Sequence, residues 1–149
     1  MMELVSFSQQ ARLLDIGSGA GFPWIVHKIV RPDLMIVSVD ARQRKIEFQR
    51  TCVRLLNLEN CELVAARLET LASQEVDYAI AKALGKVEAI AALALPHIKN
   101  NGLLVLPRSE PTKETAELAT PMGYRLELDA TYQSTPEEKR SRLLVLKKS

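Results

Sequence analysis

The fold is constrained most strongly by residues 13–23, which read Leu13-Leu14-Asp15-Ile16-Gly17-Ser18-Gly19-Ala20-Gly21-Phe22-Pro23. The first part of this segment is apolar apart from one acid, which predicts a buried strand. Glycines then recur at every second position, and without a Cβ they allow a tight turn and a close approach of the backbone to a ligand. Residues 24–30 are amphipathic. We therefore expect the glycine loop to open a helix whose free N–H groups can meet a polar ligand.

The spacing of the glycines separates two kinds of nucleotide site. A dinucleotide fold needs G-x-G-x-x-G to hold a pyrophosphate, and its third glycine would fall at Phe22, so that pattern fails. The chain instead has D-x-G-x-G-x-G, which is typical of class I S-adenosylmethionine-dependent methyltransferases. A glycine-rich surface turn is the alternative, but the strand before the loop and the helix after it favour a cofactor loop. Its expected cofactor-binding residues are Asp15, Gly17, Ser18, Gly19 and Gly21.

Strands and helices alternate along the chain. Apolar runs predict strands at 12–16, 34–39, 61–65, 76–81, 103–106, 125–128 and 143–146. Amphipathic segments predict helices at 21–30, 41–57, 86–98 and 112–120. This order predicts an α/β, Rossmann-like class I methyltransferase fold, with a mostly parallel seven-stranded sheet and helices on both faces. Because no linker or repeat interrupts the pattern, we expect residues 1–149 to form a single S-adenosylmethionine-binding domain.

Two of these segments carry more detailed expectations. In the helix at 41–57, Phe48, Cys52 and Leu55 repeat at i, i+4 and i+7, so we expect them to form its buried stripe. Pro107 is expected to stop the strand at 103–106. The cations of the helix at 41–57 could line an RNA path, but a solvated helix face is the favoured interpretation; they are Arg44, Lys45, Arg50 and Arg54.

Polar residues follow several of the predicted strands, and ligands of open α/β sheets bind at the carboxyl ends of strands. Asp40 ends the second strand, where a carboxylate can accept hydrogen bonds from both ribose hydroxyls, or cap the next helix. Leu68 and Glu69 follow the third strand, where an adenine edge would lie, or form an exposed loop. Lys82 and Arg108 follow the fourth and fifth strands, and would hold a phosphate or a methionine carboxylate unless they are solvated surface cations.

Composition excludes several other classes of protein. A net charge of +2 permits a nucleic-acid partner without demanding one. Cys52 and Cys61 lack the spacing of metal ligands and are interpreted as free thiols of a reducing cytosol. The chain has neither an HExxH motif nor an apolar run of membrane-spanning length, so we expect no metal, no membrane and a cytoplasmic location. His27 and His97 stand alone in helical segments, and we interpret both as structural.

Several motifs together resemble the GidB family, S-adenosylmethionine-dependent methyltransferases of bacterial 16S ribosomal RNA. The first is the glycine loop with its extension, Asp15 to Pro23. The others follow in order: Ile29-Val30-Arg31-Pro32-Asp33, Asp40 with Arg44-Lys45-Ile46-Glu47-Phe48, Leu56-Asn57-Leu58-Glu59-Asn60, and Arg67-Leu68-Glu69. The Phe-Pro extension of the loop is specific to this family among methyltransferases, and the resemblance covers about the first hundred residues well.

The resemblance implies methylation of N7 of a guanine, with S-adenosylhomocysteine as the product. It implies that Gly17, Phe22, Leu68 and Glu69 contact the cofactor. It also implies that Lys82 and Arg108 lie near the transferring methyl and the target base. No general base is expected, because guanine N7 has a free lone pair and loses no proton. The implied partner is 16S ribosomal RNA or the small ribosomal subunit, and a homodimer is a further expectation.

Two alternatives remain open on these motifs. The chain could be a catalytically weak, cofactor-binding interaction module that has lost its RNA-binding N-terminus. Separately, Trp24 follows the Phe-Pro extension where the family usually has glycine. Its side chain would either pack on the helix or crowd the cofactor loop.

Overall fold

A computed structural model of the chain describes residues 4–82, 84–109, 123–133, 135–136 and 139–149, so the expected helix at 112–120 lies outside the described residues. The strands are β1 (Arg12–Ile16), β2 (Met35–Asp40), β3 (Cys61–Ala65), β4 (Val76–Ile80), β5 (Ile98–Ser109), β6 (Tyr124–Tyr132) and β7 (Ser141–Lys148). The α-helices are α1 (Trp24–Val30), α2 (Gln43–Leu55) and α3 (Val87–Ala94), and the 3₁₀ turns η1 and η2 span Leu68–Thr70 and Leu95–His97.

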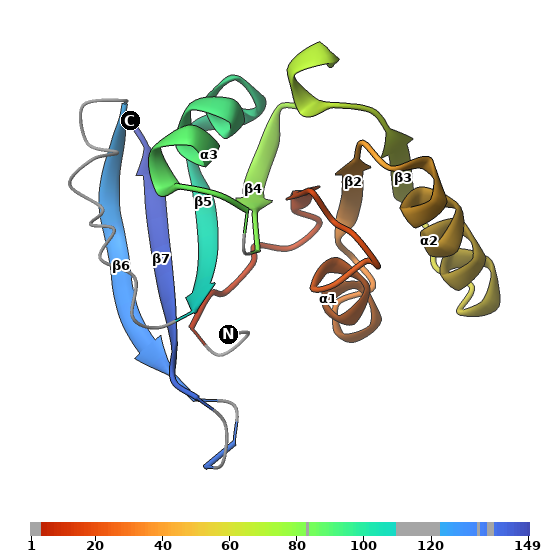
Figure 1. The fold of residues 1–149 in the computed structure, drawn as a ribbon, viewed down its shortest axis with the longest axis horizontal. Coiled ribbons are helices and arrows are strands. Elements are labelled where there is room, and N and C mark those ends of the chain that lie inside the picture. Colours follow the sequence, from red (N-terminus) through yellow and green to blue (C-terminus); the bar gives the residue numbers. More distant parts are fainter. Residues whose placement is uncertain (1–3, 83, 110–122, 134, 137–138) are drawn as a thin grey trace.

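The seven strands form one sheet in the order β3-β2-β1-β4-β5-β7-β6 (Figure 1). Neighbours from β3 to β5 pair in parallel, whereas β7 is antiparallel to both β5 and β6. Strand order therefore reverses between β1 and β4, and such a switch point is where α/β sheets bind ligands. The predicted mostly parallel sheet is confirmed.

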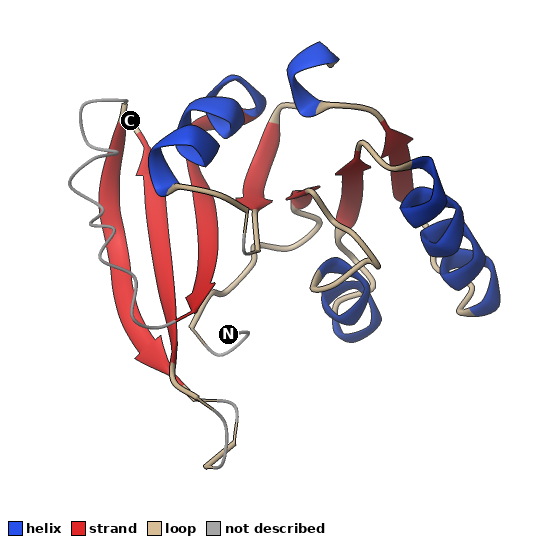
Figure 2. Cartoon of the chain, viewed as in Figure 1, coloured by secondary structure: helices blue, strands red, loops and turns tan. Residues whose placement is uncertain are grey.

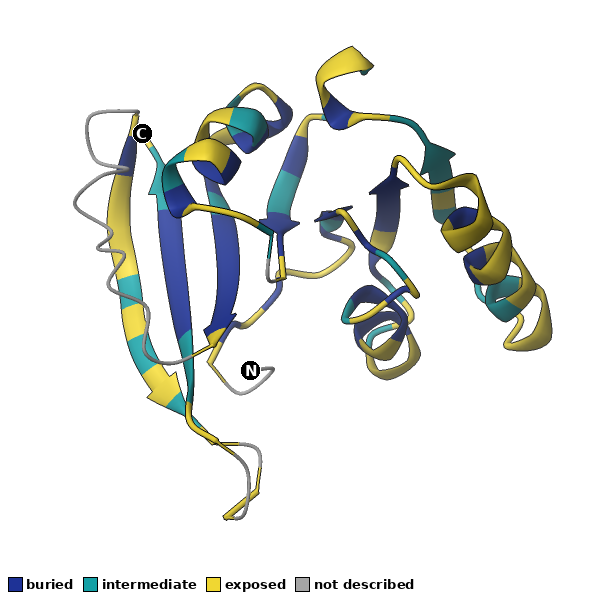
Figure 3. Ribbon diagram, in the orientation of Figure 1, coloured by how far each residue is buried: buried dark blue, intermediate teal, exposed yellow. Residues whose placement is uncertain are grey.

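Each face of the sheet carries its own hydrophobic core, because successive side chains of a strand point to opposite faces. Leu14, on one face, belongs to the core covered by α3 and the two 3₁₀ turns. Leu13, on the other face, belongs to the core covered by the N-terminal segment, α1 and α2. Figure 2 shows the helices on the two sides of the sheet, and Figure 3 shows that the central strands are the most buried.

The prediction that Phe48, Cys52 and Leu55 form the buried stripe of α2 is wrong. The buried residues of this helix are Ile46 and Gln49, whereas Phe48 is 53% exposed and Leu55 77% exposed. Cys52 is only half-buried and, like Cys61, carries a free thiol. The helix is rotated so that a polar residue faces inward, because Gln49 finds hydrogen-bond partners there that the sequence pattern does not reveal.

The expected end of the fifth strand at Pro107 is also wrong, because β5 continues to Ser109 and Pro107 pairs with Leu143 of β7. The carbonyl of Val105 accepts a hydrogen bond from Ala81, at the end of β4. The backbone groups of residue 107 point to the same side of β5 as those of Val105, toward β4, but the pairing of β5 with β4 ends at Val105. The missing N–H of proline therefore falls where no strand needs it.

Other boundaries differ too. The helix expected to reach residue 98 ends at Ala94, β5 begins at Ile98 instead of residue 103, and β6 continues to Tyr132 instead of residue 128. Residues 21–23 form turns before α1 instead of its first turn.

His27 and His97 are both buried, as expected of structural residues. Burial lowers the pKa of His27 to about 4, and neither ring nitrogen has a hydrogen-bond partner among the described residues. The ring instead packs edge-on against Phe7, with the ring centroids 5.2 Å apart. The folded protein therefore holds this imidazole neutral at a pH where the unfolded chain protonates it.

We expect His27 to make stability pH-dependent below the ordinary histidine pKa of 6.5. Between pH 6.5 and about 4 the unfolded chain binds a proton that the folded chain does not, so the free energy of unfolding falls as the pH falls, by up to about 1.4 kcal/mol for each pH unit. Urea unfolding at several pH values, compared between the natural chain and His27→Leu, measures this slope. His97 is present in both proteins and cancels. Equal slopes in the two proteins would show that His27 is not the source.

Candidate functional site

A cleft of about 590 Å³ opens at the carboxyl ends of β1, β2, β3 and β4. It brings together five of the predicted site residues, which are Gly17, Asp40, Leu68, Glu69 and Lys82. They lie at or after the ends of four different strands, so only the sheet topology makes them neighbours. Leu84, in the loop between β4 and α3, and Leu93, on α3, line one side of the cleft with apolar surface.

The glycine loop is anchored to the end of β2. The backbone N–H groups of Gly17 and Ser18 both donate to the carbonyl of Val39, at 2.8 and 3.2 Å. Gly17, Gly19 and Gly21 all have positive φ angles, between 55° and 92°, a region that residues with side chains seldom adopt. A Cβ at Gly17 would collide with Leu84, whereas a Cβ at Gly19 would meet nothing within 4 Å. The loop therefore presents bare backbone and open space beside the cleft.

Asp40 links the glycine loop to α2. Its Oδ2 accepts a hydrogen bond from the backbone N–H of Gly19 at 2.8 Å, and its Oδ1 accepts one from the backbone N–H of Arg42 at 2.9 Å. The guanidinium of Arg42 adds longer contacts of 3.2 and 3.4 Å. Burial on its own would raise the pKa of Asp40, but these hydrogen bonds outweigh it and hold the pKa below its usual value. Asp40 is thus an ionised carboxylate at the cleft.

The alternative role of Asp40 as the N-cap of the following helix is wrong. Arg42 occupies the N-cap position of α2, and no side chain caps that helix terminus. Leu68 and Glu69, the pair that could have formed an exposed loop, lie in the 3₁₀ turn η1. Leu68 is buried with its edge in the cleft lining, and Glu69 is exposed.

Asp15 lies beneath the glycine loop and does not line the cleft. Its carboxylate is 1% exposed and accepts a hydrogen bond from the backbone N–H of Trp24 at 3.3 Å. Burial raises the pKa of Asp15 well above its usual value, and the nearby Asp40 adds to the rise, while the Trp24 N–H and Lys82 oppose it. The acid of the motif therefore fixes the turn between β1 and α1 from below.

Sequence reasoning missed a buried polar cluster centred on Gln49. The side-chain amide of Gln49 donates to Ser18 Oγ at 2.8 Å and to the carbonyl of Gly19 at 2.7 Å. Its oxygen accepts from Ser38 Oγ at 2.6 Å and from the indole N–H of Trp24 at 3.0 Å. Gln49 thereby holds the glycine loop, β2 and α1 together. The sequence gives one weak signal for this cluster, which is that Gln49 lies three residues after the apolar Ile46 and so on the same helix face. A glutamine in such a position more often faces solvent.

Trp24 packs away from the cleft. Its side chain is fully buried in the core shared by α1 and the N-terminal segment, and its indole N–H is satisfied by Gln49. The side chain therefore packs in the core at α1 and does not crowd the cofactor loop. The bulk of Trp24 fills the core under the loop and leaves the cleft clear.

The remaining predicted site residues lie outside the lining of this cleft. Phe22 is 57% exposed in the loop, and Gly21 is buried against Trp24 and Ile25. Arg108 is buried near the end of β5, where its Nη1 donates to the carbonyl of Gly85 at 2.8 Å. Lys82 and Arg108 therefore do not share this cleft, although they lie near the ends of the neighbouring strands β4 and β5.

Two other kinds of feature are absent from the described residues. No helix in these parts of the chain is both long and apolar enough to cross a bilayer. Across the same residues, no group of three or more His, Cys, Asp or Glu side chains is arranged to hold a metal ion.

Solved structures with the same fold include methyltransferases. A methyltransferase from Aquifex aeolicus, described as S-adenosylmethionine-dependent, superposes with a TM-score of 0.78 at 14% identity, covering 99% of this chain and 87% of that one. TrmN from Thermus thermophilus superposes with a TM-score of 0.76 at 17% identity, covering 99% of this chain and 47% of that one. At these identities the similarity establishes the fold, which is the expected class I methyltransferase fold.

Sequence relatives are closer. Ribosomal RNA small subunit methyltransferase G from a Geobacter species is 43% identical over 122 residues, which is 80% of this chain and 54% of the relative. The enzyme of that name from Oceanobacillus iheyensis is 32% identical over 152 aligned positions, covering 95% of this chain and 64% of the relative. The chain thus spans roughly half to two-thirds of these relatives. The profile of GidB, described as rRNA small subunit methyltransferase G, matches residues 1–142. On this match and these identities, the chain belongs to the GidB family.

Proposed function

We propose that residues 1–149 form one domain that binds S-adenosylmethionine in the cleft and transfers its methyl group to N7 of a guanine in 16S ribosomal RNA. The observation that carries this proposal is the meeting of Gly17, Asp40, Leu68 and Glu69 in one cleft, in a chain of the GidB family. A volume of about 590 Å³ lies within the usual range of small-molecule sites.

Each side of the cleft has donors and acceptors that suit a nucleoside. Asp40 would accept hydrogen bonds from the ribose hydroxyls, which would replace the long contacts from the Arg42 guanidinium. The Arg42 side chain is 68% exposed, so moving it aside costs little. Leu68 offers apolar surface for the adenine, and Gly19 leaves room for the rest of the cofactor. Phe22, exposed in the loop, would cover the cofactor from the solvent side.

When bound, S-adenosylmethionine supplies an electrophilic methyl group on a positively charged sulfur. Guanine N7 has a lone pair and no proton, so the protein needs no general base. Its task is to align the base with the methyl group and to exclude water. Lys82, exposed just after β4, would position the nucleotide through its phosphates. Arg108 is buried near the end of β5, so it would help to position the nucleotide by holding the loop between β4 and α3 through the Gly85 carbonyl.

Calorimetric titration of the chain with S-adenosylmethionine and with NAD tests the cofactor. Binding of the first and not the second is expected, and absence of binding of S-adenosylmethionine would overturn the proposal. Transfer of a labelled methyl group to small ribosomal subunits or to naked 16S RNA then tests the reaction. A chain that binds the cofactor but transfers nothing would be the weak interaction module.

A further inference from the structure

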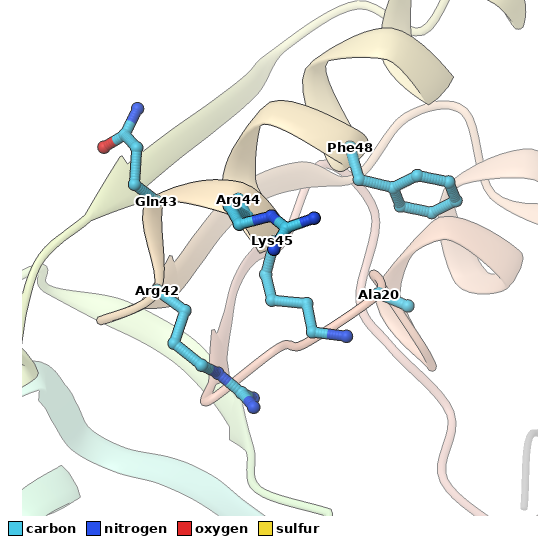
Figure 4. A pocket seen from close by; sticks show the side chains of 6 residues that line it. All are labelled: Ala20, Arg42, Gln43, Arg44, Lys45 and Phe48. Atoms are coloured by element: carbon cyan, nitrogen blue, oxygen red, sulfur yellow. The ribbon is translucent and has the colours of Figure 1, made fainter.

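A second hollow, of about 830 Å³, lies beside the cofactor cleft. It is lined by Ala20, Arg42, Gln43, Arg44, Lys45 and Phe48 (Figure 4). Ala20 belongs to the glycine loop, and Arg42 lines the cofactor cleft as well. The hollow and the cleft therefore adjoin at Arg42, and a chain molecule with one unit near the cleft could reach the hollow.

The hollow is strongly positive. It has three cations and no acidic residue in its lining. The first turn of α2 also lacks an acidic side chain. Asp40 neutralises Arg42 in part, but across the described residues neither Arg44 nor Lys45 forms a salt bridge. The nearest acid along the helix, Glu47, is already bonded to Gln43 and Arg50. Two unneutralised cations thus remain, and both are exposed to solvent.

An exposed aromatic ring completes this surface. Phe48 is 53% exposed, although its spacing in the sequence marks it as a core residue. In Figure 4 the ring points to the side of α2 on which Ala20 lies, and the Lys45 side chain extends toward Ala20. A ring left in solvent beside such cations is the combination used to bind single-stranded nucleic acid, in which bases stack on aromatic rings and cations contact phosphates.

We propose that this hollow binds an unpaired stretch of the RNA strand that carries the target guanine. Arg44 and Lys45 contact its phosphates, and an unpaired base stacks on Phe48. This inference rests on the proposed function, because it assigns the path by which the RNA reaches the cleft. The surface selects unpaired RNA, since the stacking face of a base is hidden within a duplex.

The test uses a short, fluorescein-labelled single-stranded RNA with one guanine, and anisotropy titrations at several salt concentrations. Arg44→Glu and Lys45→Glu are each expected to weaken binding about tenfold or more, and to lower the slope of log affinity against log salt by about one. Phe48→Ala is expected to weaken binding about tenfold without changing that slope, because stacking releases no counterions. Binding of S-adenosylmethionine by calorimetry should be unchanged in all three variants.

Arg54→Glu is the matched control, because it makes the same charge change on an exposed residue in the last turn of α2. It should leave RNA affinity within about twofold of the natural chain. Misfolding does not explain the expected losses, because an acid in the first turn of a helix is stabilising.

Equal losses of RNA affinity in Arg54→Glu and Arg44→Glu would show that RNA responds only to the overall charge of the chain, and would overturn the inference. Equal binding of a duplex RNA would overturn the stacking role of Phe48. If the chain methylates the small subunit but its RNA affinity is unchanged by the three substitutions, the proposed function stands and this inference is overturned. A chain that binds no S-adenosylmethionine loses the proposed function, while the RNA titrations still decide whether the hollow binds RNA.

Discussion

Gly19→Asp is expected to abolish binding of S-adenosylmethionine, with a loss of at least about a hundredfold in affinity, or about 3 kcal/mol. The fold should survive, because a Cβ at Gly19 meets nothing within 4 Å and aspartate tolerates the φ of +55° better than most residues. The new carboxylate would fill the space left open for the ligand. It would also lie close to Asp40, whose Oδ2 accepts a hydrogen bond from the Gly19 N–H, and two neighbouring carboxylates repel each other.

Calorimetric titration with S-adenosylmethionine measures this loss, and far-ultraviolet circular dichroism checks the fold. Gly123→Asp is the matched control, because Gly123 also has a positive φ, of 91°, and a Cβ there would meet only one Leu95 atom within 4 Å. Gly123 precedes β6, at the far edge of the sheet from the cleft. Its variant should bind the cofactor like the natural chain. Natural affinity in a folded Gly19→Asp protein would remove the glycine loop from the site.

Trp24→Ala is expected to lower the free energy of unfolding by about 3–5 kcal/mol, the usual cost of emptying a buried tryptophan site. The side chain is fully buried, and its loss would also leave a cavity below the glycine loop. That cost is a large part of the stability of an ordinary domain, so the alanine variant could unfold altogether. Trp24→Phe keeps most of the ring volume and loses the hydrogen bond to Gln49, so we expect an intermediate loss of about 1–2 kcal/mol.

Urea unfolding followed by circular dichroism measures both variants, since Trp24 is the chain's single tryptophan and fluorescence would vanish with it. Val30→Ala on the same helix is the control, because Val30 is 58% exposed and its loss should cost little. A Trp24→Ala protein as stable as Val30→Ala would show that Trp24 does not support the loop.

The fold was predictable from the sequence because its signals are local. Alternating apolar strands and amphipathic helices need only the order of residues to be recognised, and the seven predicted strands all exist. Strand ends were less predictable, as Pro107 shows, because the register of β4 against β5 decides whether a missing N–H matters there. Periodicity along α2 indicated an apolar stripe, but the helix turned Gln49 inward instead of Phe48.

Part of the candidate site was also predictable from the sequence, and part was not. Gly17, Asp40, Leu68, Glu69 and Lys82 were identified as strand-end residues, and parallel strands bring such ends to one edge, so their meeting in the cleft followed from the topology. Gln49 was missed because its partners are distant in sequence, with Trp24 25 residues away and Ser18 31 residues away. The basic hollow was missed because it depends on Phe48 being left in solvent.

The order of residues alone establishes the glycine loop of residues 13–23, the alternation of strands and helices, and the resemblance to the family, because each of these is written in neighbouring residues. The rotation of α2 depends on packing, which turns Gln49 toward the loop and leaves Phe48 beside Arg44 and Lys45. Packing also places Trp24 in the core instead of the cleft. The physical reason is that burial and hydrogen bonding depend on which residues pack together in the folded chain, and these partners cannot be identified from a residue's neighbours in the sequence.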